Sequence, residues 1–205
     1  MSDPLDLGLF PLDLVLLPGE RVPLHLFEPR YRQLYADCVL EDLPFVILRT
    51  SPQGTEDVGC SARFETLVQR YEDGRMNVVV AGVEPVRVVE ETEGRLYFSA
   101  QVEPLADDPA DAPRDLVERV MERYRALAGL DGDAPPGLPE GVARSYAVAS
   151  RFELPPEPKQ ELLEERSEAR RLELVAGLLD QVDKEMAHAR LAAHRASGNG
   201  KVTTP

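Results

Sequence analysis

The opening stretch from Leu7 to Tyr31 constrains the fold of this 205-residue chain more than any other segment. Within it, the Pro18-Gly19 pair predicts a turn, because proline presets φ and glycine accepts φ > 0. The runs on either side, Leu12 to Leu17 and Val22 to Phe27, are short, apolar and bounded by breakers, so both are predicted to be β-strands. Since proline cannot donate to a ladder, Pro11 and Pro23 should lie at strand starts, edges or bulges.

A helix is predicted directly after this stretch, from Pro29 to Leu40. Glu28-Pro29 opens it, because the missing N–H of proline costs nothing at the first helical position. Apolar residues then recur at a spacing of three and four, which places them on one helical face. These residues are Tyr31, Leu34, Tyr35, Cys38 and Val39.

The middle of the chain has the pattern of an antiparallel meander. Phe45 to Leu48 is a short apolar run typical of a fully buried strand, and Ser51 to Asp57 is a loop by composition. Two hairpins are then predicted. The segments Val58–Tyr71 and Arg75–Val83 flank Glu72-Asp73-Gly74, and Val86–Glu91 and Arg95–Val102 flank Glu93-Gly94. Strands in series with tight turns indicate an antiparallel sheet or a small barrel.

Beyond a linker rich in proline and acidic residues, from Ala106 to Pro113, the apolar period changes to that of helices. A break from Gly129 to Gly141 separates the first helix from later ones. The last helix carries an apolar stripe, formed by Leu172, Val175, Leu179, Val182 and Met186. We therefore predict an α+β chain with a β subdomain at 5–105, a helical bundle at 112–192 and a disordered tail at 193–205.

Three segments carry a resemblance to a known family. Phe10-Pro11-Leu12, Leu17-Pro18-Gly19 and the run PLHLFEPRY from Pro23 to Tyr31 resemble the opening signature of the Lon protease N-terminal, substrate-binding domain. The segment from Gly59 to Gly82 is similar to the hairpin of that family, and Leu154 to Leu179 is loosely similar to its C-terminal part. The chain departs from the family at Glu84-Pro85, where basic and aromatic residues are usual. The resemblance implies a PUA-like antiparallel β pseudo-barrel with one inserted helix, followed by a helical bundle.

Composition argues against several classes of partner. The net charge is −14, and no cluster of lysine and arginine is present to neutralise phosphates, so we expect no nucleic acid partner. No apolar run approaches the roughly 18–20 residues that span a bilayer, and no signal segment opens the sequence, so we expect a cytoplasmic protein without membrane contact. Cys38 and Cys60 are expected to be buried thiols in a reducing compartment.

Motifs of catalysis and metal binding are incomplete in this sequence. Gly198 to Lys201 ends like a phosphate-binding loop, but Arg195 and Val202 replace residues that this loop requires. Glu185 and His188 form one E-x-x-H unit, whereas a di-iron bundle needs two. Lon proteases use a serine–lysine pair and an ATPase domain, and no segment here resembles either. We therefore expect no catalytic residue, no cofactor and no metal, and a chain that holds the substrate-binding part alone.

The favoured function is non-catalytic binding of exposed apolar or extended segments of unfolded proteins. A separate ATPase or protease is an additional candidate partner, and independent action is the alternative. An incompletely closed meander leaves a free strand edge, to which an extended client can add as a strand. The apolar side chains expected at this edge are Leu12, Leu14, Leu16, Val22, Leu24 and Leu26. The alternative for each of them is barrel core.

The charged and aromatic residues that follow have a mainly structural interpretation. Glu28, Arg30 and Tyr31 are expected to dock the first helix, as a charge pair and an aromatic anchor, rather than to bind a ligand. His25, between two apolar residues and near Phe27 and Pro29, is expected to be a hydrogen-bonded structural histidine.

Two rival functions remain. One is a small-molecule binder with a pocket between barrel and bundle, and the other is an enzyme with a dispersed site.

Overall fold

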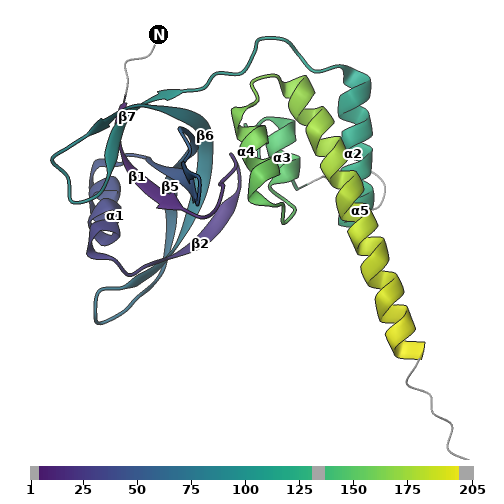
Figure 1. Ribbon diagram of the computed structural model, residues 1–205, viewed down its shortest axis with the longest axis horizontal. Helices are drawn as coiled ribbons and strands as arrows, with labels where there is room; N and C mark the ends of the chain where they lie inside the picture. Colours follow the sequence, from purple (N-terminus) through teal and green to yellow (C-terminus); the bar gives the residue numbers. More distant parts are fainter. Residues whose placement is uncertain (1–4, 131–136, 199–205) are drawn as a thin grey trace, which may run out of the picture.

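The computed structural model describes residues 5–130 and 137–198, in which the strands and the first helix form one part and the later helices form another (Figure 1). The α+β class is therefore confirmed. The strands are β1 (Leu5–Leu12), β2 (Arg21–Leu26), β3 (Phe45–Ser51), β4 (Gly54–Thr55), β5 (Val58–Arg70), β6 (Met76–Thr92) and β7 (Ser99–Pro104). The helices are α1 (Pro29–Glu41), α2 (Arg114–Ala128), α3 (Arg144–Ala149), α4 (Pro156–Glu164) and α5 (Glu168–Gly198).

Five of the strands close into a ring. The order is β1-β7-β6-β5-β3, all antiparallel, and a parallel pairing of β1 with β3 completes the circuit. Strand β4 extends the sheet from β3, and β2 pairs with β6 outside the ring. This arrangement is the pseudo-barrel that the sequence resemblance implied, with α1 inserted between β2 and β3.

Strand β3 is buried on both faces, as its uninterrupted apolar run predicts. Phe45 and Ile47 belong to the main hydrophobic cluster, and Val46 and Leu48 belong to a second, smaller cluster. A strand whose two faces both lack polar residues can only sit between two apolar layers. The helix prediction at Pro29–Leu40 is also confirmed, except that Val39 is exposed rather than buried.

The predicted strand from Leu12 to Leu17 is wrong. Strand β1 ends at Leu12, and the following residues are irregular, although Val15, Leu16 and Leu17 are almost completely buried. The carboxylate of Glu20 accepts the N–H of Leu17 at 2.9 Å, so a side chain satisfies a backbone group that a strand would have paired. A short apolar run predicts burial here, and it does not distinguish a strand from a buried loop. The turn at Pro18-Gly19 is confirmed, with a φ of 77° at Gly19.

The hairpin around Asp73-Gly74 is confirmed, but β6 runs on without the break predicted at Glu84-Pro85. Pro85 has no N–H, and it is accommodated beside an irregularity in the β5–β6 register, where Cys60 lies opposite it. The second hairpin also forms, although β7 begins at Ser99 rather than at Arg95.

Helices follow the linker as predicted, and the apolar stripe of α5 is buried at Leu172, Val175 and Leu179. The predicted start of a disordered tail at residue 193 is wrong, because α5 continues to Gly198. The alanine-rich sequence of this segment favours helix even where the apolar stripe has ended. Residues 199–205, and 131–136 within the predicted break, lie outside the described residues.

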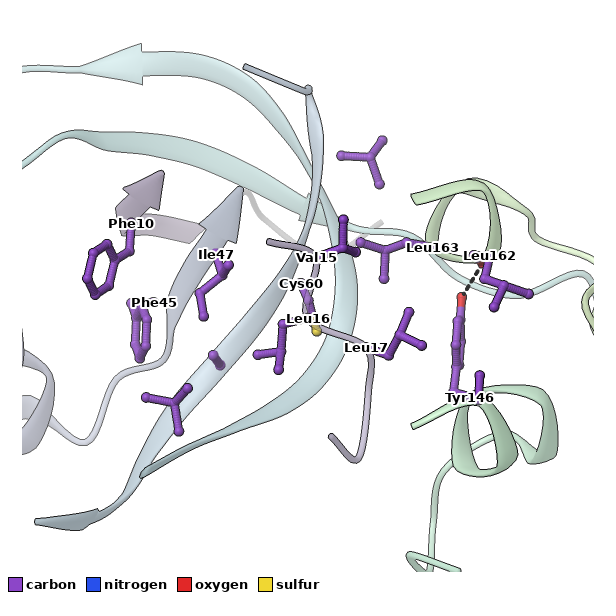
Figure 2. Close-up of a cluster of buried hydrophobic side chains, with 14 of the residues drawn as sticks. Phe10, Val15, Leu16, Leu17, Phe45, Ile47, Cys60, Tyr146, Leu162 and Leu163 are labelled. Atoms are coloured by element: carbon purple, nitrogen blue, oxygen red, sulfur yellow. Dashed lines mark hydrogen bonds between the residues drawn. The ribbon is translucent and has the colours of Figure 1, made fainter. Parts of the chain in front are cut away.

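The strands and the later helices share one hydrophobic core. Figure 2 shows Phe10 and Phe45 at one end of this core and Tyr146 at the other, with Leu16 and Leu17 between them. Two buried hydrogen bonds cross the same interface. Lys159 Nζ donates to the carboxylate of Glu20 at 2.7 Å, and Gln160 Nε2 donates to the carbonyl of Val58 at 3.0 Å.

Arg171 ties the linker to α5. Its guanidinium is fully buried and donates to both carboxylate oxygens of Asp107, one of them at 2.7 Å. It also donates to Glu168 at 2.8 Å and to Ser145 Oγ at 3.0 Å, and it lies over the ring of Tyr146. A buried cation is tolerated only when its donors are satisfied in this way.

Truncation of the buried stripe should destabilise the fold. We expect Leu172→Ala and Leu179→Ala each to lower the free energy of unfolding by about 2–5 kcal/mol, because each leaves a cavity in the core. The matched control is Leu40→Ala in α1, whose side chain is 84% exposed and which should change stability little. Denaturant melts of the three variants test this, and a larger loss in Leu40→Ala than in the other two would contradict the assignment.

Loss of the linker carboxylate should also destabilise the fold. We expect Asp107→Ala to cost about 1.5–3 kcal/mol, because hydrogen bonds to the buried guanidinium of Arg171 are lost while Glu168 remains. Asp108→Ala removes a neighbouring exposed carboxylate that has no side-chain partner in the described residues. It should leave the free energy of unfolding almost unchanged. Equal denaturation midpoints for the two variants would show that the Asp107 contacts contribute nothing.

Candidate functional site

Strand β2 has one open edge. Its residues pair in antiparallel register with Met76–Ala81 of β6, whose opposite side pairs with β5. Along its other edge, β2 has no strand partner within residues 5–130 and 137–198. A strand in this position presents unpaired backbone groups to the surroundings.

The hydrogen-bond pattern tells which residues of β2 face the open edge. In an antiparallel pair, residues that bond to the partner strand alternate with residues whose backbone groups point away from it. The N–H of Gly82 donates to the carbonyl of Glu20 at 2.9 Å, so Glu20 is at a bonded position. Counting from Glu20 along the register, the residues bonded to β6 are Val22, Leu24 and Leu26. The residues that face the open edge are Arg21, Pro23 and His25.

Pro23 therefore lies at the centre of the open edge. Its missing N–H does not weaken the ladder with β6, which is the position that a proline in a strand requires. The edge offers three carbonyl acceptors, but its only two N–H donors are those of Arg21 and His25.

Polar contacts hold the solvent-facing side chains of β2 in place. Arg21 forms a bidentate ion pair with Glu65 of β5, at 2.7 and 2.8 Å. His25 Nδ1 lies 2.6 Å from the side-chain oxygen of Asn77, whose amide donates to the hydroxyl of Tyr71. Sequence reasoning did not select Arg21 or Glu65, because their pairing depends on strand register, which leaves no local signal.

The six apolar residues expected at this edge divide into two groups. Leu12, Leu14, Val22 and Leu24 are half-buried and pack against the main cluster. Leu16 and Leu26 have relative exposures of only 1% and 0%. The expectation that they form part of an accessible surface is therefore wrong, and both belong to the barrel core. Leu26 is buried because even-numbered residues of β2 face the core, and Leu16 is buried because its loop enters the core.

The residues after β2 anchor α1. Glu28 and Arg30 form an ion pair at 2.8 Å, and the Arg30 guanidinium lies 4.6 Å from the ring centre of Tyr31. Tyr31 in turn stacks on Phe10, with ring centres 3.9 Å apart. Pro29 is the first residue of the helix. These contacts are those of a docking motif. Phe27 differs, since its ring stacks near His25 and is 60% exposed.

Neither cysteine is an activated nucleophile. Burial raises the pKa of the Cys38 thiol to about 12 and also raises the pKa of Cys60, so both are neutral thiols near pH 7. In the described part of the chain, no group of three or more histidine, cysteine or acidic side chains is arranged to hold a metal ion. The segment from Gly198 to Lys201 lies outside the described residues after its first glycine.

The interface between strands and helices is filled by side chains. Val15, Leu17, Leu162 and Leu163 occupy it with Tyr146, whose hydroxyl donates to the carbonyl of Leu162 at 3.2 Å (Figure 2). Three surface pockets, of about 480, 180 and 230 Å³, are each lined by residues of the strand part alone or of the helical part alone. This arrangement gives no support to a small-molecule pocket between the two parts.

Comparison with known proteins supports the resemblance. The family described as the ATP-dependent protease La (LON) substrate-binding domain matches residues 6–181, which is most of the chain. The chain belongs to the Lon substrate-binding domain family. A Lon protease from Paraburkholderia phytofirmans is 26% identical over 200 residues, which cover 87% of this chain and 24% of that protein. The chain thus spans about a quarter of the length of this curated relative.

Solved structures of Lon N-terminal domains have the same fold. The Lon N-terminal domain protein from Xanthomonas campestris is 25% identical, with a TM-score of 0.64 over 84% of this chain and 98% of that one. The N-terminal domain of the Mycobacterium avium complex Lon protease is 17% identical, with a TM-score of 0.63, and covers 85% and 98% of the two chains. As in the sequence, the described residues include no helix long and apolar enough to cross a bilayer.

Proposed function

We propose that this Lon-type domain binds extended segments of other polypeptides along the open edge of β2 and catalyses no reaction itself. The observation that carries the proposal is the unpaired backbone of Arg21, Pro23 and His25. An extended segment added there would bond to the backbone of these residues, as in other cases of strand addition.

Recognition of this kind depends weakly on client sequence. Each backbone hydrogen bond contributes a net free energy of about 0.5–1.5 kcal/mol, whatever side chain the client carries. Specificity then comes from alternate client side chains, and the half-buried Val22 and Leu24 and the exposed Phe27 favour apolar ones. The net charge of −14 favours basic or neutral clients, with association slowed by salt.

A domain that binds polypeptides without catalysis can deliver them to a separate enzyme. The relative from Paraburkholderia phytofirmans is called a Lon protease, and only 24% of its length aligns with this chain. Degradation in the Lon family requires an ATPase and a serine–lysine pair. We therefore propose a separate ATPase or protease as the functional partner of this domain.

Hydrogen exchange with a permanently unfolded client tests the binding site. Reduced and carbamidomethylated lysozyme is a suitable client, because it is basic and cannot refold. We expect protection of the Arg21 and His25 amides on addition of the client, since these donors have no strand partner in the free protein. Protection confined to the helices after Pro113 would overturn the proposal.

Restoring the missing donor should strengthen binding. We expect Pro23→Ala to bind the unfolded client about two- to tenfold more tightly, because it adds one backbone N–H at the open edge. Pro109→Ala in the linker is the matched control and should leave affinity unchanged. Fluorescence anisotropy with labelled client measures both. An unchanged or weaker affinity in Pro23→Ala would contradict edge binding.

The purified protein should show no turnover. We expect no hydrolysis of ATP and no cleavage of casein, since no phosphate-binding loop or serine–lysine context is present in the sequence. Colorimetric phosphate release and gel electrophoresis measure the two reactions. Activity that is abolished by a point substitution in this chain would refute the non-catalytic assignment.

A further inference from the structure

A second surface feature contains no residue of β2. It is a pocket of about 180 Å³, which we call the acidic pocket. Its floor is apolar and opens onto the smaller hydrophobic cluster through Leu9 and Leu48, both nearly buried. Its lining residues are Leu9, Pro11, Leu48, Thr55, Glu56, Asp57, Val88, Glu91 and Phe98.

Three carboxylates without an ion pair in the described residues line the acidic pocket. Glu56, Asp57 and Glu91 line it without a lysine, arginine or histidine among the other lining residues. None of the three carboxylates forms an ion pair with another residue in the described part of the chain. The larger pocket beside α2 and α5 differs, because its Asp180 pairs with Arg123 at 2.6 Å.

The backbone holds this rim in a fixed position. The N–H of Glu56 donates to the carbonyl of Arg49, and the N–H of Val88 donates to the carbonyl of Asp57, both at 2.9 Å. The carbonyl of Phe98, another lining residue, accepts the N–H of Leu9 at 2.7 Å. The pocket is therefore built on paired backbone rather than on free loops.

We propose that the acidic pocket binds the side chain of an exposed lysine or arginine on a polypeptide client. These side chains combine an apolar stem with a terminal cation, and they bury the stem while the cation stays at the rim. The apolar floor matches the stem, and the three carboxylates match the cation. The proposal deepens the polypeptide-binding function and rests on it for the class of partner. It adds a preference for basic residues that strand addition alone does not supply.

A minimal peptide tests the pocket apart from the β2 edge. The probe is an acetylated and amidated pentapeptide of glycines with one central lysine, and the control probe replaces lysine with norleucine. Titration of the full chain is followed by amide NMR shifts. We expect the lysine peptide to shift Leu9, Leu48, Val88 and Phe98, and the norleucine peptide to have no such effect.

Charge-matched variants separate the pocket from the general acidity of the protein. Glu56→Gln/Glu91→Gln should weaken binding of the lysine peptide by about two- to fivefold per carboxylate removed. Glu161→Gln/Glu173→Gln removes two exposed carboxylates from helices and should leave binding unchanged. Circular dichroism melts confirm that both variants fold.

Several results would overturn the proposal. These are equal weakening in the two double variants, shifts spread over the whole acidic surface, or equal binding of the norleucine peptide. A simple diamine that binds while the lysine peptide does not would also overturn it. Pocket binding is followed at Leu9, Leu48, Val88 and Phe98, whereas edge binding is followed at the amides of Arg21 and His25, so failure of the edge and failure of the pocket are distinguishable.

Discussion

The close approach of Leu17 to Gly82 determines how the β-part of this domain is assembled. A side chain at Gly82 would overlap the carbonyl oxygen of Leu17, so the buried loop can pass this point of β6 only because glycine lies there. At the same point β6 changes partners, since β2 pairs with the residues before Gly82 and β7 with those after Pro85. The bond from Gly82 to Glu20 also sets which residues of β2 face outward. One close contact thus fixes the loop, the register and the orientation of the open edge.

Glu20 extends this arrangement to the helices. One of its carboxylate oxygens accepts the N–H of Leu17, and the carboxylate also accepts the ammonium of Lys159 from α4. Both charged side chains are largely buried, so the pair is favourable only while the turn and the helix keep their relative positions. The same turn contacts Pro139 beside Gly19. The turn that precedes β2 is therefore held by the helical part.

Local signals in the sequence were enough to predict much of this fold. The Asp73-Gly74 hairpin, the helix after Pro29 and the buried strand at Phe45–Leu48 each depend on residues that are close in sequence. The irregular loop at Val15–Leu17 was missed because burial and strand formation give the same apolar pattern. The acidic pocket had no local signal, since its residues come from β1, β3, β4, β6 and the β4–β5 and β6–β7 connections and meet only because the ring closes. The outward direction of Pro23 likewise follows from register alone.

An open strand edge that binds other chains must also avoid binding a second copy of itself. Two identical edges would pair through their N–H and C=O groups, and this pairing leads to aggregation. Pro23 removes the central donor, so neither a client nor a second copy can form a continuous ladder. Arg21 and Glu65 add a charge pair on the solvent face, and the net charge of −14 makes two copies repel. The acidic surface that opposes self-association attracts basic clients, so the same charge serves both purposes. Weak backbone binding at the interrupted β2 edge would then be supplemented by charge attraction at the acidic pocket. Two weak contacts suit a domain that must release each client.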